Sequence, residues 1–300
     1  MHFIIETING IIDDIEQFVL VKRLESQSSN HTYSLIDKND LIEFVKHTKS
    51  IDFNEAIPVG SIDFVKIYLK TVHDISDLKP IEVPYILRKY KYLKRDYAIL
   101  KREELPQKGI YFLKSASKLK NFTYLGEISN IVNSSNNFLD DELYVVSDKV
   151  EILSEYRCFI LNDIIKGIQH YSGDCTVALS KNDINLIKEM VKEYSKDNTR
   201  PRAYTLDVAI IRNKGVAIIE VHTHSSVGLY GYDDESLPYH YKFGFDWYLC
   251  SKNYTLRESN SYMYKRRHFN NIEVITNPIS INLSIKKFSE EKNKVYKKEI

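Results

Sequence analysis

The feature that most constrains the fold of this chain is an apolar segment with a turn in its middle, AYTLDVAIIRNKGVAIIEVHTHS, at residues 203–225. β-Branched and other apolar residues fill both halves, a pattern typical of two paired, buried strands. The turn falls in the sequence RNKG, at residues 212–215. Titratable side chains interrupt the apolar pattern at Asp207, Glu220 and His222. Burying these ionisable groups in an apolar hairpin is unfavourable unless each has a partner, so their presence there calls for an explanation.

The position of the turn decides which residues face each other. A two-residue turn at 213–214 places Asp207 opposite Glu220. A turn at 214–215 places Asp207 opposite His222 instead. In both registers the three titratable side chains lie on one face, because side chains alternate along a strand. Two carboxylates that face each other repel, so we predict that a divalent cation lies between them.

The ligand types indicate which ion this would be. Carboxylate oxygens favour Mg²⁺ or Mn²⁺, and the imidazole of His222 favours a transition ion. One alternative is a solvent-facing polar surface of the hairpin, although the neighbouring residues are apolar. A zinc pair of His222 and His224 is a further alternative, but no cysteine lies nearby and structural zinc sites usually have four ligands. We interpret His224 as a residue of the turn or of a substrate pocket.

Length and composition exclude several classes of protein. Three hundred residues favour about two domains, and a net charge of +1 makes nucleic acid an unlikely partner. No apolar stretch is long enough to predict a membrane span. The three cysteines, Cys158, Cys175 and Cys250, form no CxxC motif and are typical of reduced thiols. We therefore expect a cytoplasmic protein without a membrane partner.

The pattern along the chain predicts an α+β protein. Residues 1–105 read as an α/β lobe, in which IDFVKIYL is a strand or a buried helix. Residues 106–255 alternate strands with one amphipathic helix in NDINLIKEMVKEYSKD, and the pairing is largely antiparallel. Residues 256–300 form a basic C-terminal extension. The expected division is an N-terminal lobe, a second domain and this extension.

Basic side chains stand at selected places in the second domain. Lys114 ends an apolar strand, and Lys120 follows in a loop. Arg157 lies inside the apolar strand EYRCFIL, so it needs an anionic partner, which is either an acid of the protein or a phosphate group. The sequence contains neither GxxxxGK[ST] nor GxGxxG, so side chains would have to bind phosphates.

Together these motifs resemble the ATP-grasp superfamily, and in particular a small clade of phage and bacterial ATP-grasp domain proteins. The resemblance covers roughly residues 55–250. It rests on Lys114 and Lys120 with Phe122 and Gly126, and on the segments IPVGSIDFV, SEYRCF, LDVAI, IIEVH and SVGLYG. It implies an ATP-grasp fold, in which two α+β subdomains, at about 106–150 and 151–255, enclose the nucleotide.

The resemblance also implies how ATP would be held. Lys114 and Lys120 would contact the phosphates or the adenine side of ATP. The segment from Ser147 through Val150 to Glu151 would pair its backbone with adenine. Arg157 would face the γ-phosphate or an acyl phosphate.

For the metal, the resemblance implies that Asp207 and Glu220 hold Mg²⁺ or Mn²⁺. The third ligand in such proteins is usually an asparagine two residues after the glutamate, and here His222 stands at that position. This departure bears on the identity of the metal and on catalytic competence.

The activity that the resemblance implies is ATP-dependent, ADP-forming ligation of a carboxylate to an amine through an acyl phosphate. The partners would then be ATP, a carboxylate substrate and an amine acceptor, either a small molecule or a peptide. Arg157 and Lys114 would be the catalytic residues. Phosphotransfer to a hydroxyl and non-catalytic nucleotide binding are alternatives, and His222 favours the second of them.

Overall fold

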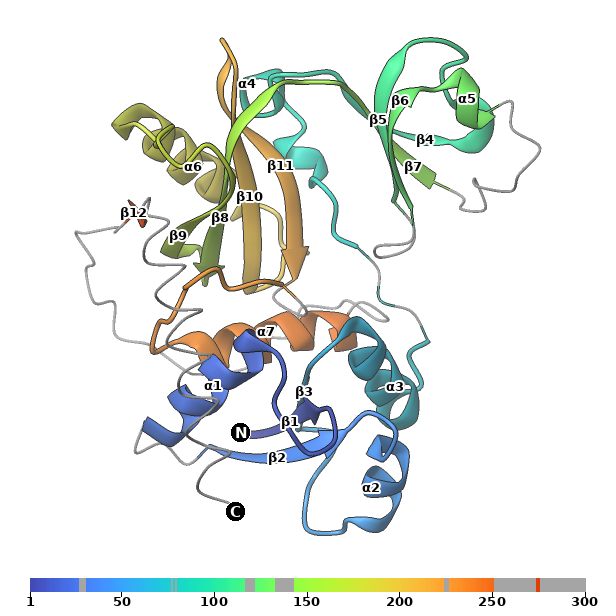
Figure 1. The fold of residues 1–300 in the computed structure, drawn as a ribbon, viewed down its shortest axis with the longest axis vertical. Coiled ribbons are helices and arrows are strands. Elements are labelled where there is room, and N and C mark those ends of the chain that lie inside the picture. Colours follow the sequence, from blue (N-terminus) through green and yellow to red (C-terminus); the bar gives the residue numbers. More distant parts are fainter. Residues whose placement is uncertain are drawn as a thin grey trace.

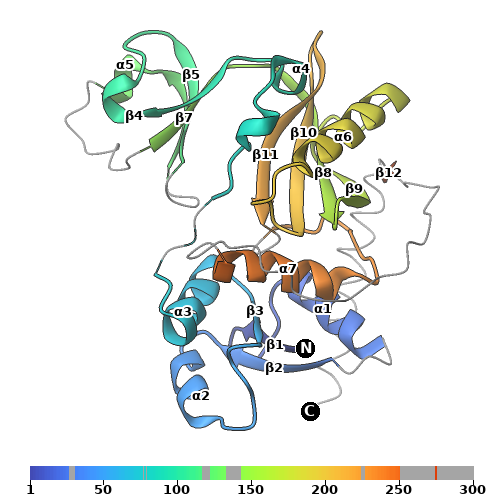
Figure 2. The same cartoon turned by 180° about the vertical axis from the view of Figure 1, so that it is seen from behind.

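The computed structural model describes residues 1–26, 31–76, 78, 80–116, 122–132, 143–223, 227–250 and 274–275. Its elements gather around three separate sheets, which Figure 1 shows from one side and Figure 2 from behind. One sheet forms a lower lobe, and the other two stand side by side above it. Among the described helices, none has the length and apolar composition that a membrane crossing needs.

The lower lobe is built on a parallel sheet of order β2-β1-β3. Its elements are β1 (His2–Thr7), α1 (Ile15–Ser26), β2 (Thr32–Asp37), α2 (Leu41–His47), β3 (Ile57–Val59) and α3 (Ile62–His73). The segment IDFVKIYL, read from the sequence as a strand or a helix, is helix α3. The hydroxyl of Ser61 begins this helix by accepting a hydrogen bond from the backbone N–H of Phe64 at 3.2 Å. The lobe therefore is of mixed α/β character, as the sequence predicts.

The second sheet is antiparallel, with the order β4-β7-β5-β6. The elements of this part of the chain are η1 (Tyr85–Leu87), α4 (Tyr90–Leu93), β4 (Tyr97–Lys101), η2 (Arg102–Glu104), β5 (Ile110–Ser115), β6 (Thr123–Glu127), α5 (Ser129–Val132) and β7 (Leu143–Asp148). Strand β4 precedes the expected domain boundary at residue 105 and yet pairs with β7. The sheet of the first subdomain thus takes one strand from the segment assigned to the N-terminal lobe.

The third sheet has the order β11-β10-β8-β9-β12. Its strands and the helix beside it are β8 (Ile152–Leu161), β9 (Ile164–Gly173), α6 (Lys181–Tyr194), β10 (Ala203–Ile211), β11 (Gly215–Thr223) and β12 (Val274–Ile275). Helix α6 packs its apolar face on this sheet, as its sequence pattern predicts, through Ile187, Met190, Val191 and Tyr194. Of the basic C-terminal extension, the structure describes β12, which pairs in parallel with β9.

Helix α7 (Leu237–Cys250) follows the third sheet in sequence but belongs to the core of the lower lobe. Its residues Tyr241, Phe245 and Tyr248 are buried in the same apolar cluster as Phe3 of β1. In Figure 1 this helix lies across the top of the lobe, beneath the third sheet. The chain therefore returns to the lobe after building both upper sheets, which fixes the lobe against them.

Candidate active site

The hairpin of β10 and β11 pairs Asp207 directly with Glu220. The first of the two registers expected from the sequence is therefore confirmed, but the two-residue turn is wrong. Ile211 pairs with Gly215, so residues 212–214 form the turn. The register then shifts by one residue between Asp207 and Val208, at a β-bulge. The bulge restores the pairing that the longer turn would have displaced.

The bulge also changes which side chains share a face. In a regular strand Ile218 and Glu220 would point to the same side. Here Ile218 is fully buried in the core beneath α6, whereas Ile219 and Glu220 both line a pocket on the opposite face. The extra residue in β11 is Ile219. It allows Ile218 to fill the core while Glu220, two residues later, faces the pocket.

The three titratable residues of the hairpin form one cluster. A ligand atom from each of Asp207, Glu220 and His222 lies within 4.8 Å of the other two. Nε2 of His222 lies 2.6 Å from Oε2 of Glu220 and 4.0 Å from Oδ2 of Asp207. The structure thus brings together the metal-binding set expected from the sequence.

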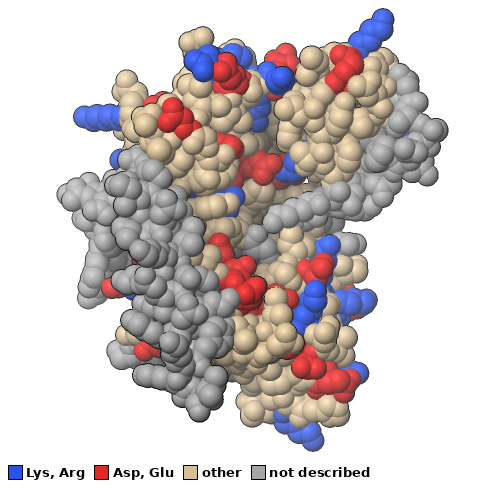
Figure 3. Space-filling model, in the orientation of Figure 1, with Lys and Arg blue, Asp and Glu red and all other residues tan. Residues whose placement is uncertain are grey.

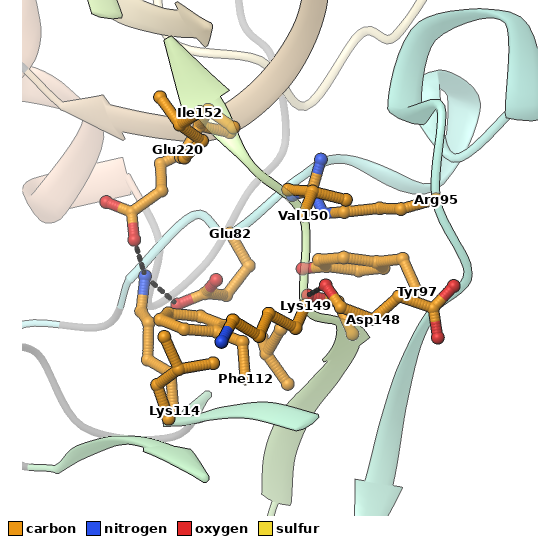
Figure 4. A pocket seen from close by; sticks show the side chains of 14 residues that line it. Glu82, Arg95, Tyr97, Phe112, Lys114, Asp148, Lys149, Val150, Ile152 and Glu220 are labelled. Atoms are coloured by element: carbon orange, nitrogen blue, oxygen red, sulfur yellow. Dashed lines mark hydrogen bonds and ion pairs between the residues drawn. The ribbon is translucent and has the colours of Figure 1, made fainter. Parts of the chain in front are cut away.

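Lys114 of β5 reaches this cluster from the second sheet, as Figure 4 shows. Its Nζ lies 2.9 Å from Oε1 of Glu220 and 3.0 Å from Oε1 of Glu82. Burial lowers the pKa of Lys114, but the charges of Glu220 and Glu82 outweigh it and raise that pKa. Burial likewise disfavours ionised Glu220, but the hydrogen bond with His222 and the charge of Lys114 hold its pKa below the usual value. The cluster therefore contains a charged lysine between two carboxylates.

Arg157 of β8 binds the other carboxylate of the cluster. Its Nε and Nη2 donate to the two oxygens of Asp207 at 2.8 and 2.7 Å. Nη1 donates to the carbonyl of Gly228 at 3.1 Å, and the guanidinium lies over the rings of Tyr171 and Tyr230. The anionic partner that the sequence requires is thus an acid of the protein, Asp207, which lies across the sheet on the neighbouring strand.

The pocket itself lies between the second and third sheets. Lys114 and Glu220 form one end, and residues 147–150 form another part of the wall. The apolar side chains that complete it include Phe112, Leu125, Val145, Ile152 and Ile219. Further charged side chains, those of Arg95, Asp148 and Lys149, line the pocket away from Lys114 and Glu220, as Figure 4 shows. An apolar slot with charged groups at its ends suits a ligand with a ring system and an anionic tail.

Three of the six sequence-predicted nucleotide residues line this pocket, namely Lys114, Ser147 and Val150. Arg157 is not among the lining residues, because it lies against Asp207 beside the pocket. Glu151 is not among the lining residues: its carboxylate pairs with Nε of Arg212 at 2.6 Å, and its carbonyl accepts the backbone N–H of Arg212. Lys120 and His224 lie outside the described residues.

Two charged groups at this site were missed by the sequence analysis. Glu82 adopts a left-handed backbone conformation with φ of 55° and is 6% exposed. Arg95, also buried, lines the pocket and donates from Nη1 to the carbonyl of Ile218 at 2.7 Å. An acid between two prolines and an arginine in a polar connection carry no periodic signal, so only the fold reveals them.

The donor set can accept a divalent cation. Two carboxylates and one imidazole supply oxygen and nitrogen ligands, a combination that suits Mn²⁺ and related ions and admits Mg²⁺. In this arrangement Arg157 and Lys114 supply the positive charge that the acids need. A bound cation would take over that role at Asp207 and Glu220.

Two α+β units facing each other across a pocket, with a lysine on one sheet and paired acids on the other, define an ATP-grasp fold. The comparison with protein families agrees, because residues 91–238 match the model of an ATP-grasp domain, the second family of its clade. Residues 91–238 of this chain therefore carry an ATP-grasp domain.

The solved structures that this chain is similar to are distant from it in sequence. D-alanine–D-alanine ligase from Bacillus anthracis, complexed with ATP, is 14% identical, with 83% of this chain and 96% of that chain covered and a TM-score of 0.48. The same enzyme from Coxiella burnetii is 12% identical, with 84% and 96% covered and a TM-score of 0.47. A RimK domain ATP-grasp protein from Sphaerobacter thermophilus is 14% identical, with 83% and 100% covered and a TM-score of 0.46. A comparison with curated proteins gave no match.

Proposed function

We propose that this protein is an ATP-dependent, ADP-forming ligase that joins a carboxylate to an amine through an acyl phosphate. The observation that carries the proposal is the contact of Lys114 from one sheet with Glu220 from the other, beside the pair of Arg157 and Asp207. Because of this contact, one end of the pocket between the sheets holds both cations and carboxylates. The ATP-grasp family supports the proposal.

In this proposal each residue has a defined task. Residues 147–150 pair with adenine, and the cation held by Asp207, Glu220 and His222 would neutralise phosphate charge during transfer. Lys114 turns from Glu220 to the phosphates once nucleotide is present. Arg157 faces the transferring phosphoryl group, and its two tyrosine neighbours keep the guanidinium in place. Positioning and charge neutralisation are the whole of the catalytic contribution.

The reaction balances in two steps. The γ-phosphoryl group of ATP passes to an oxygen of the substrate carboxylate, which gives ADP and an acyl phosphate. The amine nitrogen then attacks the acyl carbon, the bond from that carbon to the phosphate oxygen breaks, and phosphate leaves with the electron pair. The nitrogen loses one proton as the amide forms.

The first test is a thermal-shift measurement with ATP and either Mg²⁺ or Mn²⁺, in which we expect a rise in the melting temperature. No shift with either metal would remove the nucleotide site. We also expect Asp207→Asn and Glu220→Gln to abolish ADP formation while the far-ultraviolet circular dichroism spectrum is retained. Full activity in either variant would remove that residue from the metal site.

A non-catalytic nucleotide-binding protein is the second candidate. It is favoured by the same cluster, because Arg157 occupies both oxygens of Asp207 and Lys114 lies between two acids. A site neutralised by its own side chains needs no metal to be stable. ATP binding without ADP release in the presence of any carboxylate and amine pair would favour this candidate, whereas amine-dependent ADP release would favour the ligase over both it and a phosphotransferase.

A further inference from the structure

Glu82 is a carboxylate of the pocket wall to which the proposed function gives no task. It lies in the link from α3 to η1, between Pro80 and Pro84, with φ of 55° and an exposed fraction of 6%. Its side chain lines the pocket between the second and third sheets. Figure 3 shows acidic and basic side chains together where these two parts of the molecule meet. A buried acid beside a site for phosphates repels them, so its presence calls for an explanation.

Metal binding does not explain Glu82. Within the described ranges, the group of side chains that could hold an ion consists of Asp207, Glu220 and His222. Glu82 lies outside that group and is linked to it by Lys114. Stability does not explain Glu82 either, because a buried ion pair is often no more stabilising than the apolar residues that could replace it. The effect of Glu82 on Lys114 is the remaining explanation.

The backbone of Glu82 is fixed to the third sheet. The next residue, Val83, is 1% exposed and packs in the apolar cluster between α6 and the strands of that sheet. The carbonyl of Val83 accepts a hydrogen bond from Nε of Arg88 at 2.8 Å, and the proline that follows restricts its backbone to extended conformations. Glu82 therefore keeps its position relative to the third sheet, whereas Lys114 belongs to β5 of the second sheet.

Lys114 contacts its two carboxylates in different ways. It donates a hydrogen bond to Oε1 of Glu220 at 2.9 Å. Its Nζ also lies 3.0 Å from Oε1 of Glu82, but within the described part of the chain this buried oxygen accepts no hydrogen bond. The ammonium group is thus aligned on Glu220, and Glu82 retains an unused acceptor. A charged acceptor already within reach can receive the ammonium group once another ion occupies Glu220.

The two acids therefore differ in what a bound cation does to them. A cation held by the metal-binding group competes with Lys114 for Glu220 but leaves Glu82 in place. A lysine side chain is long and flexible, so without a second acceptor it would spread over several rotamers after losing Glu220. With Glu82 beside it, the ammonium group stays at the end of the pocket where the phosphates would lie.

We propose that Glu82 is the positioning residue of Lys114, which holds the ammonium group at the phosphate end of the pocket when a metal ion occupies Glu220. The inference rests on the nucleotide-binding part of the function proposed above and adds to it a residue that acts through Lys114. It gives the effect of Glu82 on ATP affinity a defined sign. By charge alone the carboxylate lowers the affinity for ATP, whereas as the positioning residue it raises that affinity.

The test measures the Kd of a non-hydrolysable ATP analogue with Mg²⁺ by calorimetric titration of the full chain, with adenosine as the ligand that lacks phosphates. We expect Glu82→Gln to bind the analogue at least about fivefold more weakly, because a neutral amide aligns an ammonium group less strongly than a carboxylate does. Its affinity for adenosine should equal that of the wild type. Glu82→Asp keeps the charge on a shorter side chain and should bind the analogue with intermediate affinity. Glu189→Gln on α6, which removes the partner of Lys91, is the matched control.

Lys114→Met decides whether Glu82 acts through the lysine. In that background Glu82→Gln should no longer weaken binding of the analogue, since the group that it positions is gone. Circular dichroism checks that each variant is folded, and Glu82→Asp carries the comparison where Glu82→Gln does not fold.

Tighter or unchanged binding of the analogue in Glu82→Gln, an equal loss for adenosine, or the same loss with and without Lys114 would overturn the proposal. Any of these results with a wild type that binds the analogue would leave the nucleotide site in place. A wild type that does not bind the analogue would remove the nucleotide site and the role of Glu82 together.

Discussion

Lys114 carries the positive charge that compensates two carboxylates between the upper sheets. It is 14% exposed and lies between Glu82, 6% exposed, and Glu220. The charge of the lysine opposes the rise that burial causes in the pKa of Glu82, yet that pKa stays above its usual value. Removing one member of a buried group of charges leaves the others without compensation, which costs more than the group itself contributes.

We therefore expect Lys114→Met to lower the free energy of unfolding by about 3 kcal/mol, because both carboxylates lose their shared cation. Urea denaturation followed by circular dichroism measures this. The double variant Lys114→Met with Glu82→Gln should recover part of the loss, since one of the unpaired charges is then gone. A single variant as stable as the wild type would show that water already compensates the two acids.

His222 stands where the resemblance to ATP-grasp proteins leads us to expect an asparagine. Its imidazole lies 2.6 Å from Glu220, so its identity affects the ligand set rather than the fold. We expect His222→Asn to retain the thermal shift with ATP and Mg²⁺ and to lose part of any preference for Mn²⁺, because oxygen replaces nitrogen as the third ligand. His47→Asn, an exposed change on α2, is the control. Complete loss of nucleotide binding in His222→Asn would assign the imidazole a specific role.

At the scale of the element, the bulge in β11 decides what the hairpin presents to each side. Ile218 fills the core under α6, and its neighbour Ile219 forms part of the pocket wall beside Glu220. In a regular strand Ile218 and Ile219 would also face opposite sides, but Glu220 would return to the core side with Ile218. Because of the bulge, Glu220 instead faces the pocket together with Ile219. The hairpin can place Glu220 opposite Asp207 because the side chains of β11 do not alternate between the two faces at the bulge.

Two matched substitutions test this division. Ile218→Ala should lower the free energy of unfolding by about 3 kcal/mol, because it opens a cavity in a packed core. Ile219→Ala should cost less than about 1 kcal/mol, since the side chain is only half-buried, yet it should weaken binding of a non-hydrolysable ATP analogue. Calorimetric titration and urea denaturation of both variants provide the comparison. The reverse order of the two effects would contradict the bulge as the cause.

For the whole molecule, the junction between the lower lobe and the upper sheets is held partly by polar contacts. Glu16 of α1 accepts a hydrogen bond from Leu229, which follows β11, and α7 returns from the third sheet into the core of the lobe. This arrangement places Glu16 in a half-buried setting beside Asp14. The pKa that results, about 8, links the stability of the assembled molecule to pH.

The sign of this linkage follows from the raised pKa. An unfolded glutamate has a pKa of about 4.3, so between that value and about 8 the folded state binds more protons than the unfolded state. The contribution of Glu16 to stability is thus lost as the pH rises through this window. We expect Glu16→Gln to be more stable than the wild type at pH 8, by on the order of 2 kcal/mol, with a much smaller difference at pH 5. Melting temperatures of both proteins across this range measure the effect, and a difference independent of pH would contradict it.

The sequence by itself determined the parts of this protein that depend on local pattern. The apolar halves of 203–225, the amphipathic face of α6 and the side-chain alternation around Asp207 are each read from neighbouring residues, because strand and helix periods act over short distances. The resemblance to ATP-grasp proteins came from the order of such segments, and the family comparison confirmed it.

Only the tertiary structure decided what meets across long distances in the chain. The bulge between Asp207 and Val208, the placing of Glu82 beside Lys114, and the choice of Asp207 as the partner of Arg157 all depend on how three sheets pack together. A pocket in the lower lobe likewise arises where α1 and α3 approach residues 227–228. Contacts of this kind lie far apart in the sequence and leave no period in it, so the energies that select them appear only once the chain is folded.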